Sequence, residues 1–438
     1  MKKFVVLLVV VALTCVSAMA FAAEVTVGGS VEVRSRNFSN MDFNDDATDT
    51  DKTSHKDTQT RMKIDVNAKA GDVKGKLSLW NDFETWGDNS VSATSFETQP
   101  GSVSSAATTT LVGDDTPIKY NNNTIGFREA WVSFNLPGIP VNVTAGHQLL
   151  TLGNGWFFRS MHFGSDAWVI SNQTGPNTAA LVNVKFAENT LANADDKDAY
   201  VLLDVFKLSD TMTVGADITY LHDRSDKTEI VNLQNLGVNF NGKLGPVALK
   251  AEVDMQMGEV DNAAGDDPKF KGNQVVLQGS VPLDPVTVNF TVARGTGSKA
   301  TDNDIKGFQN LLDVDPHYTA IWEYKVGHPG VEGADGKLGA KNFGFANTTA
   351  IGVGATFAAT SNLTVGADFW QLMSSEDIPN KAEGTGTTDE IGAEIDLKVN
   401  WKVAENLTWN WVVGYLMAGD GLGKDDATGV QGVLGFKF

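Results

Sequence analysis

An alternation of apolar and polar residues constrains the fold of this sequence more than any other feature. It is clearest in 391–402, where Ile391, Leu397 and Trp401 share one parity and charged residues take the other. Residues 25–36, 61–70 and 247–256 repeat the pattern, which has the period of a β-strand. Strands of about 10–13 residues exceed the usual length of 5–6. About ten residues is the length that crosses a bilayer at a tilt.

The same alternation continues to the last residue, in GVLGFKF at 432–438. Leu434, Phe436 and Phe438 share one face, whereas a chain end without a structural role is usually polar and without pattern. We interpret this segment as the closing strand of a barrel, which pairs with the first strand so that no edge remains.

The sequence begins MKKFVVLLVVVALTCVSAMAFAAE, with two lysines, an apolar stretch and small residues spaced for cleavage. This pattern predicts a signal peptide over 1–22, secretion through the inner membrane, and a mature barrel over 23–438. A membrane anchor is the alternative, but the apolar run is short. No later stretch of about 18 apolar residues offers a transmembrane helix. The only cysteine, Cys15, lies within the predicted signal, so we expect no disulfide, thiol metal site or c-type haem.

The connections between the predicted strands alternate in length. Tight turns are expected at KAGDVKG, NLPGIP, KLSDTM, GKLGP, PLDP, ATSN and VAEN. Long loops are expected near 37–58, 85–123, 152–162, 259–270, 296–345 and 374–387. Short periplasmic turns and long extracellular loops are the layout of an outer-membrane barrel. The prediction is therefore an all-β, transmembrane, antiparallel up-and-down barrel.

The strand count follows from keeping every tight turn on one side. Counting forward from Val25 and backward from Phe438 agrees only if 163–172 and 178–187 form a hairpin around NQTGPN. This gives about 18 strands, with 16 if one hairpin has been overcounted. A soluble β-sandwich, jelly roll or adhesin is the alternative, but its strands would be shorter.

Aromatic residues at the lower ends of strands provide an independent indication. Outer-membrane barrels carry aromatic girdles at the membrane interfaces. The predicted outward positions of the periplasmic girdle are Phe134, Phe206, Phe240, Phe357, Trp401 and Phe438.

The inward face is predicted to be polar and mixed in charge. The candidate pore-wall charges are Arg34, Arg36, Arg61, Lys63, Lys74, Lys76, Glu252, Asp254, Glu394 and Asp396. The basic members cluster on the first three strands, so opposed basic and acidic sectors could form a transverse field that favours polar solutes. Simple pairing of these charges across strands is the alternative.

The segment TLGNGWFFRSMHFGSDAW, roughly 151–167, is richer in aromatics than a loop in water requires. We interpret it as a loop folded into the lumen. The predicted constriction residues are Trp156, Phe157, Arg159, His162 and Asp166. The alternative is that the segment is the upper rim of two strands.

The net charge of −20 disfavours nucleic acid as a partner. Loop 37–58 is rich in aspartate but lacks the glycine and glutamate of a calcium loop, so we interpret it as a solvated acidic loop that enriches cations at the mouth. Weak divalent binding that bridges to lipopolysaccharide is the alternative. GxSxG and HExxH motifs are absent, and the histidines are scattered. We expect no enzymatic activity, no catalytic residues, no metal site and no cofactor.

The leader, the amphipathic strands, the alternating connections and the terminal GFKF together resemble the Gram-negative outer-membrane porins. The stretch FREAWVSFNLPGIPVNVTAGHQLLTLGNGWFF (127–158) is locally similar to alginate-export-type channels, although His147 occupies their arginine position. The porin resemblance implies a passive channel in the cell outer membrane for ions and small hydrophilic solutes, here with a mild cation preference. It also implies contact with lipids and lipopolysaccharide, recognition of the strand ending at Phe438 by the barrel-assembly machinery, and a homotrimer. A solute-specific channel, alginate-export-like or for another anionic substrate, and a scaffold barrel with periplasmic or surface partners are the alternatives.

Overall fold

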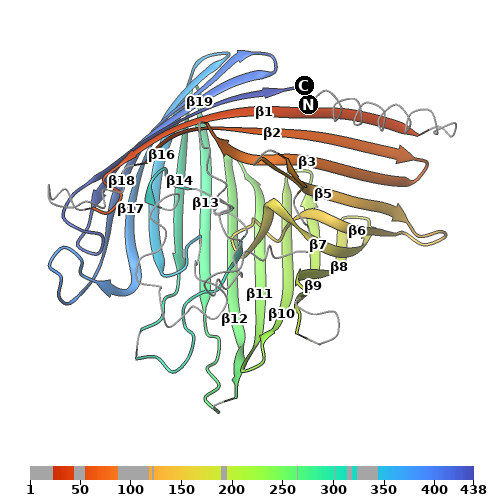
Figure 1. Cartoon of the computed structure of the whole chain (residues 1–438), viewed down its shortest axis with the longest axis horizontal. Helices are drawn as coiled ribbons and strands as arrows, with labels where there is room; N and C mark the ends of the chain where they lie inside the picture. The colour runs from red at the N-terminus through yellow and green to blue at the C-terminus, as the bar shows by residue number, and fades with distance from the viewer. Residues whose placement is uncertain are drawn as a thin grey trace.

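The computed structural model describes residues 23–43, 55–86, 118–120, 123–188, 195–263, 265–299, 301–312, 318–322 and 344–438. Within these ranges the chain forms one sheet in which 18 antiparallel strands close into a barrel (Figure 1). The prediction of about 18 strands is confirmed. The predicted signal peptide, 1–22, lies outside the described residues.

The strands of the barrel run from 10 to 18 residues. They are β1 (Glu24–Ser39), β2 (His55–Ala70), β3 (Val73–Thr85), β5 (Asn123–Asn135), β6 (Val141–Thr151), β7 (Phe158–Thr174), β8 (Asn177–Ala187), β9 (Lys197–Ser209), β10 (Met212–Asp226), β11 (Glu229–Leu244), β12 (Val247–Asn262), β13 (Asn273–Leu283), β14 (Val286–Gly295), β16 (Thr348–Thr360), β17 (Leu363–Pro379), β18 (Thr387–Ala404), β19 (Leu407–Ala418) and β20 (Ala427–Lys437). Two short strands lie beside this ring: β4 (Ile118–Tyr120) pairs with β5, and β15 (Leu311–Leu312) pairs in parallel with β7.

Strand β20 closes the barrel against β1, and the red and blue ends of the chain run side by side in Figure 1. The register extends from Ser30 opposite Lys437 to Ser39 opposite Thr428. At the end of the chain the Gly29 N–H donates to the Phe438 carbonyl at 2.9 Å, and the Phe438 N–H donates to the Gly29 carbonyl at 3.1 Å. The last residue is therefore part of the sheet, as the alternation in GVLGFKF predicted.

The tight turns predicted from sequence all lie at one end of the barrel. Most leave two residues between strands, as at 71–72 between β2 and β3 and 245–246 between β11 and β12. The hairpin around NQTGPN is β7–β8, which turns at 175–176. Gly71, Gly175 and Gly245 have φ near +60°, a conformation that suits glycine in such turns.

Some loops are shorter than predicted because the strands extend beyond the bilayer length. Strand β7 already begins at Phe158, so the loop expected at 152–162 ends five residues early. Strand β12 continues to Asn262 and β17 to Pro379. Of the loops expected near 37–58 and 85–123, residues 44–54 and 87–117 lie outside the described residues.

The outward face of the barrel is apolar. Leu397, Ile218 and Leu202 are each more than half exposed, although they are large hydrophobic residues. Of the predicted girdle, Phe206, Phe357, Trp401 and Phe438 are exposed on this face, while Phe134 and Phe240 are half-buried. Two further aromatics extend it, because Trp409 lies 6.3 Å from Trp401 and 5.5 Å from Trp411 between ring centroids. In the part of the chain that the structure describes, no helix is both long and apolar enough to cross a membrane.

Closure leaves little room for a side chain at Gly29, which shares the outward face of Val27. A Cβ there would lie 2.4 Å from the Lys63 carbonyl oxygen and 2.7 Å from the Phe438 ring. We predict that Gly29→Val destabilises the barrel, because overpacking typically costs about 1–3 kcal/mol. A lower unfolding temperature on heated gel electrophoresis would show this. Val27→Leu, at a residue that is 67% exposed, is the matched control and should change little.

Candidate functional site in the barrel interior

The barrel interior is filled by chain segments that fold inward from its loop end. We name them the first inward segment (152–157), the second (305–312) and the third (318–322). Leu152 and Phe157 of the first are buried against Val184, Leu221 and Leu233 of the wall. The neighbours of these wall residues along each strand are less buried than they are, so the cluster lies on the inner face. The interior is thus a packed constriction rather than a bare cylinder.

Glu252 on β12 holds the first inward segment. Its carboxylate accepts hydrogen bonds from the backbone N–H groups of Asn154 at 2.5 Å and Trp156 at 3.1 Å. Glu252 is only 3% exposed, so its carboxylate contacts the loop rather than water. Gly153 permits this approach, because its φ is +54° and a Cβ would lie 2.6 Å from the Glu252 carboxylate.

Glu394 on β18 holds the third inward segment in the same way. Its two oxygens accept the backbone N–H groups of Ala320, Ile321 and Trp322 at 2.9, 2.7 and 2.9 Å. Glu394 is fully buried. Gly414 on the neighbouring strand leaves the space for this segment, since a Cβ there would lie 2.9 Å from Ile321.

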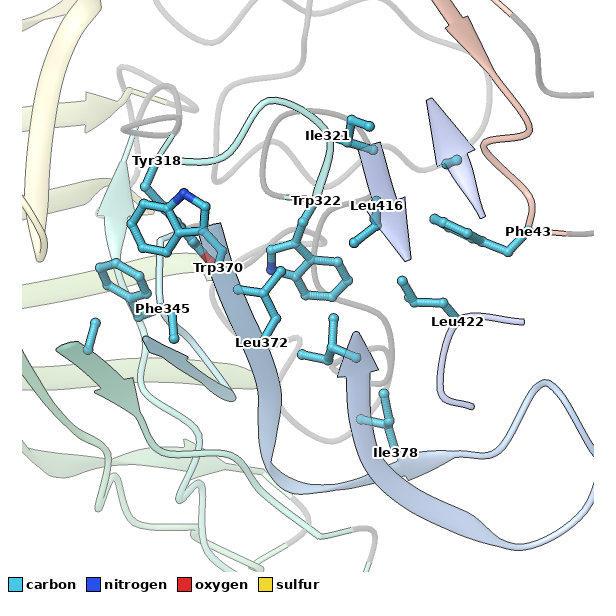
Figure 2. Packing of buried hydrophobic residues seen from close by; sticks show 14 of the residues in the cluster. Phe43, Tyr318, Ile321, Trp322, Phe345, Trp370, Leu372, Ile378, Leu416 and Leu422 are labelled. Carbon is cyan, nitrogen blue, oxygen red and sulfur yellow. The ribbon is translucent and has the colours of Figure 1, made fainter. Parts of the chain in front are cut away.

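An aromatic cluster surrounds the third segment (Figure 2). The Tyr318 ring lies 4.5 Å from Phe345 and 5.3 Å from Trp370 between centroids. Trp156 of the first segment also contacts Phe345, at 4.7 Å. Figure 2 shows Trp322 pointing toward Leu372 of the wall. The first and third segments therefore share one core.

The second inward segment is held by backbone pairing and by an amide. The Gln256 side chain accepts from the Gln309 N–H at 2.9 Å and donates to its carbonyl at 2.5 Å. Strand β15 then pairs with Phe158 and Arg159 at the start of β7. Phe308 packs edge-on against Phe157 with centroids 6.2 Å apart.

Two further wall acids are also buried. Asp254 accepts from the side-chain amides of Asn235 at 2.9 Å and Gln274 at 2.7 Å. Asp396 is fully buried beside Glu394. All four predicted acidic wall residues point into the barrel, but the inward segments and wall amides cover them.

The basic sector on β1, β2 and β3 is organised around two aromatic rings. The guanidinium carbon of Arg34 lies 3.5 Å from the Phe83 centroid, and that of Arg61 lies 4.1 Å from it. Arg61 and Arg128 each lie about 5.5 Å from the Trp80 ring, at 5.4 and 5.5 Å. Such contacts orient guanidinium groups over aromatic faces. We call Arg34, Arg61, Arg128, Trp80 and Phe83 the arginine–aromatic track.

Acidic and amide groups position the members of the track. Arg34 donates to Gln59 at 2.6 Å, and Arg61 forms an ion pair with Glu32 at 2.6 Å. Arg128 donates to the carbonyl oxygens of Met161 and His162 at 2.6 and 3.2 Å.

The other basic wall candidates form ion pairs. Arg36 pairs with Asp57 at 2.5 Å and is nearly buried. Lys63 pairs with Asp65 at 2.9 Å, and Lys76 pairs with Glu129. Lys74 is exposed near the turn end of β3. The side chains of Arg61, Lys63 and Lys76 keep 22%, 28% and 23% of their surface exposed.

Ion pairs also stabilise the rim from which the second segment enters the barrel. Lys306 donates to Asp302 at 2.5 Å and Lys271 donates to Asp304 at 2.5 Å. These hydrogen bonds lower the pKa of both aspartates, so both pairs are formed at neutral pH.

The structure brings together most, but not all, of the predicted constriction residues. Trp156 and Phe157 are buried in the first inward segment, and Arg159 follows it at the start of β7. The His162 ring packs edge-on against Trp80 of the track, with centroids 4.7 Å apart. Asp166 is placed elsewhere.

Asp166 lies on the outward face of β7. It shares that face with Trp168, which is 57% exposed, and it contacts His147 at 2.8 Å. The cause is a local irregularity between β6 and β7, where Gln148 pairs with Ser165 but Leu150 pairs with Ser160. The extra residues 161–164 cannot be anticipated from an alternation with period two.

Sequence reasoning missed Arg128, Trp80 and Phe83 of the track, and the role of Gln256. The glycines at 153 and 155 and the inward Gly414 were the available signals, because they mark places where another segment approaches closely. A lumenal cavity of about 190 Å³ remains beside the third segment. It is lined by Phe38, Tyr318, Thr319, Ala320, Lys398, Val412, Gly429 and Gln431.

Comparison with known proteins shows what this fold resembles. No family model matches the sequence, and no curated protein matches it. The solved structures of similar fold include a BenF-like porin from Pseudomonas fluorescens Pf-5, with a TM-score of 0.56 at 10% identity over 95% of this chain and 98% of that chain. OccK11 (OpdR) from Pseudomonas aeruginosa has a TM-score of 0.55 at 9% identity over 94% and 96%. OpdK from the same species, solved with vanillate, has 0.53 at 9% identity over 94% and 98%.

At these identities the likeness is one of fold. The closed barrel of 18 strands, with short turns at one end and long connections at the other, is the architecture of the Gram-negative outer-membrane porins. The fold agrees with the location in the cell outer membrane that the sequence predicted.

We predict that Glu394→Ala frees the third inward segment. Three backbone N–H groups would lose their acceptor, and each unsatisfied group costs about 1–3 kcal/mol of stability. We expect larger and noisier single-channel currents in planar bilayers. Glu394→Gln retains an acceptor oxygen and is the matched control. Identical currents in the wild type and the alanine variant would show that this segment does not limit conduction.

Proposed function

We propose that this protein is a passive outer-membrane channel for ions and small hydrophilic solutes. The observation that carries the proposal is a lumen narrowed by anchored inward segments beside a wall of partly exposed basic side chains. Size exclusion by the segments and an electrostatic filter on the wall together account for selection without chemistry or energy input.

The sign of the filter depends on which charges reach water. Glu252 and Glu394 are buried and bonded to backbone N–H groups. Arg61, Lys63 and Lys76 keep 22%, 28% and 23% of their side-chain surface exposed, and their partners Glu32, Asp65 and Glu129 keep 28%, 18% and 6%. The constriction would therefore favour anions, and a cation preference would come from the aspartate-rich loop expected near 37–58. The mild cation preference predicted from sequence holds only if the mouth dominates.

The arginine–aromatic track favours a second candidate, a channel specific for small organic anions that carry a ring. Guanidinium groups bind carboxylates through charge-assisted hydrogen bonds, and the Phe83 and Trp80 rings hold the three guanidinium groups of the track in position. The structure of OpdK with vanillate offers a precedent for an aromatic carboxylate in a channel of this fold.

Reversal potential under a salt gradient in planar bilayers tests both candidates. A general porin gives ohmic currents with weak selectivity that benzoate and acetate reduce alike. An organic-anion channel gives anion preference and saturable block by benzoate but not acetate. Silence under all conditions would contradict both and favour the scaffold alternative.

Removing the track should alter selectivity in a defined direction. We predict that Arg34→Ala/Arg61→Ala shifts the reversal potential toward cations and raises the half-blocking benzoate concentration roughly tenfold or more. The reason is that a hydrogen bond to a charged group contributes about 1.5–3 kcal/mol, and 1.4 kcal/mol corresponds to a factor of ten.

Arg294→Ala is the matched control for this variant. Arg294 is exposed on β14 and shares the outward face of Val292, so the substitution removes a charge outside the lumen. If the control shifts the potential as much as the double variant does, the track is not the filter.

A further inference from the structure

The outward face of β6–β12 changes character in steps toward the loop end. Residues in register across neighbouring strands share a face, so each row can be followed around the barrel. One row is entirely apolar. It consists of Val143, Ile170, Leu181, Leu202, Ile218, Leu236 and Met255.

The next row toward the loop end is rich in amphipathic side chains. It consists of Ala145, Trp168, Asn183, Tyr200, Tyr220, Gln234 and Met257. Aromatic residues with a polar atom prefer the boundary between hydrocarbon and headgroups. This row therefore marks the outer boundary of the hydrocarbon.

The row beyond it is polar and mostly charged. It consists of His147, Asp166, Lys185, Asp198, His222, Asn232 and Glu259. The backbone of Glu259 also forms an isolated antiparallel β-bridge with Lys269 of the loop that follows β12. These side chains face outward at the level of the lipid headgroups.

A groove crosses the upper two rows above β10, β11 and β12. It has a volume of about 590 Å³ and is lined by Tyr220, Asn232, Gln234, Gly258, Glu259 and Lys269. Gly258 lies in its lining, and the position requires glycine because its φ is +106° and a Cβ would lie 2.0 Å from the Asn232 carbonyl oxygen. No side chain can occupy that position without moving the backbone.

The Asn232 side-chain amide holds Tyr220 of the groove in place and links it to His222 and Asp261 beside the groove. The Asn232 side-chain oxygen accepts from the Tyr220 hydroxyl at 2.8 Å and lies 2.8 Å from His222 Nδ1. Its amide nitrogen donates to Asp261 at 2.9 Å. The Tyr220 and His222 rings lie nearly parallel, 5.8 Å apart. The groove thus presents the Tyr220 ring, the side-chain amides of Asn232 and Gln234, the Glu259 carboxylate and Lys269.

We propose that this groove binds the phosphorylated sugar headgroup of a glycolipid in the outer leaflet. The Tyr220 ring offers a face to a sugar ring, and Gln234 and Glu259 offer hydrogen bonds to its hydroxyls. Lys269 supplies the positive charge for a phosphate. The acyl chains would continue along the apolar row of Ile218, Leu236 and Met255. This binding site is independent of conduction through the lumen.

The test measures the unfolding temperature of the full-length protein in phosphatidylethanolamine–phosphatidylglycerol vesicles with and without lipid A, a phosphorylated diglucosamine lipid. Lipid A should raise the unfolding temperature of the wild type. The gain should be lost in Tyr220→Leu/Lys269→Ala. It should persist in Tyr200→Leu, which removes an exposed tyrosine of the same row that does not line the groove.

Equal gains in the wild type and the double variant would overturn the proposal. The same gain from additional phosphatidylglycerol, or from inorganic phosphate alone, would also overturn it, because a sugar would then be unnecessary. The single variant Lys269→Ala guards against a folding defect in the double variant, since Lys269 is exposed and its loss should weaken the gain without altering the barrel.

Discussion

The rest of the structure depends on the hydrogen bonding of β1 to β20. A bilayer interior offers no partner for backbone N–H and C=O groups, so a sheet can cross it only if it has no open edge. Closure through Gly29 and Phe438 meets that requirement at the last residue of the chain. Once the sheet is closed, each strand side chain faces either the lipid or the lumen. Apolar residues of the alternating pattern then face the lipid, and polar residues face the lumen.

A barrel of 18 strands is too wide for its own side chains to fill. The chain fills it with segments from its long connections, and it uses wall carboxylates to hold them. Glu252 accepts two backbone N–H groups and Glu394 accepts three, and these groups would otherwise lack partners in the interior. A carboxyl group offers two acceptor oxygens to such N–H groups, and close contact is possible because glycines at 153 and 414 leave space.

The consequence is an uneven distribution of exposed charge around the barrel wall. The acidic residues Glu252 and Glu394 are covered by the inward segments that they anchor. The basic wall remains partly open, because Arg34, Arg61 and Arg128 lie against the rings of Phe83 and Trp80. The numbers of acidic and basic wall residues in the sequence therefore do not give the charge that a solute meets in the lumen. On the outer surface, position also determines the role of a polar group. The outward rows of β6–β12 change from apolar to amphipathic to charged toward the loop end, so only the polar side chains of the last two rows can meet lipid headgroups.

The sequence by itself determined the fold class, the strand count, the position of the turns and the face on which nearly every strand residue lies. These properties are local, because a period of two is set by the geometry of a single extended segment. Only the tertiary structure decided which inward charges are anchors and which face water. Glu252 meets a loop 98 residues away at Asn154, and Glu394 meets one 74 residues away at Ala320. Tertiary structure also turned Asp166 outward, through the irregular pairing of β6 with β7. No periodicity encodes such contacts, because they depend on how distant segments pack inside the closed barrel.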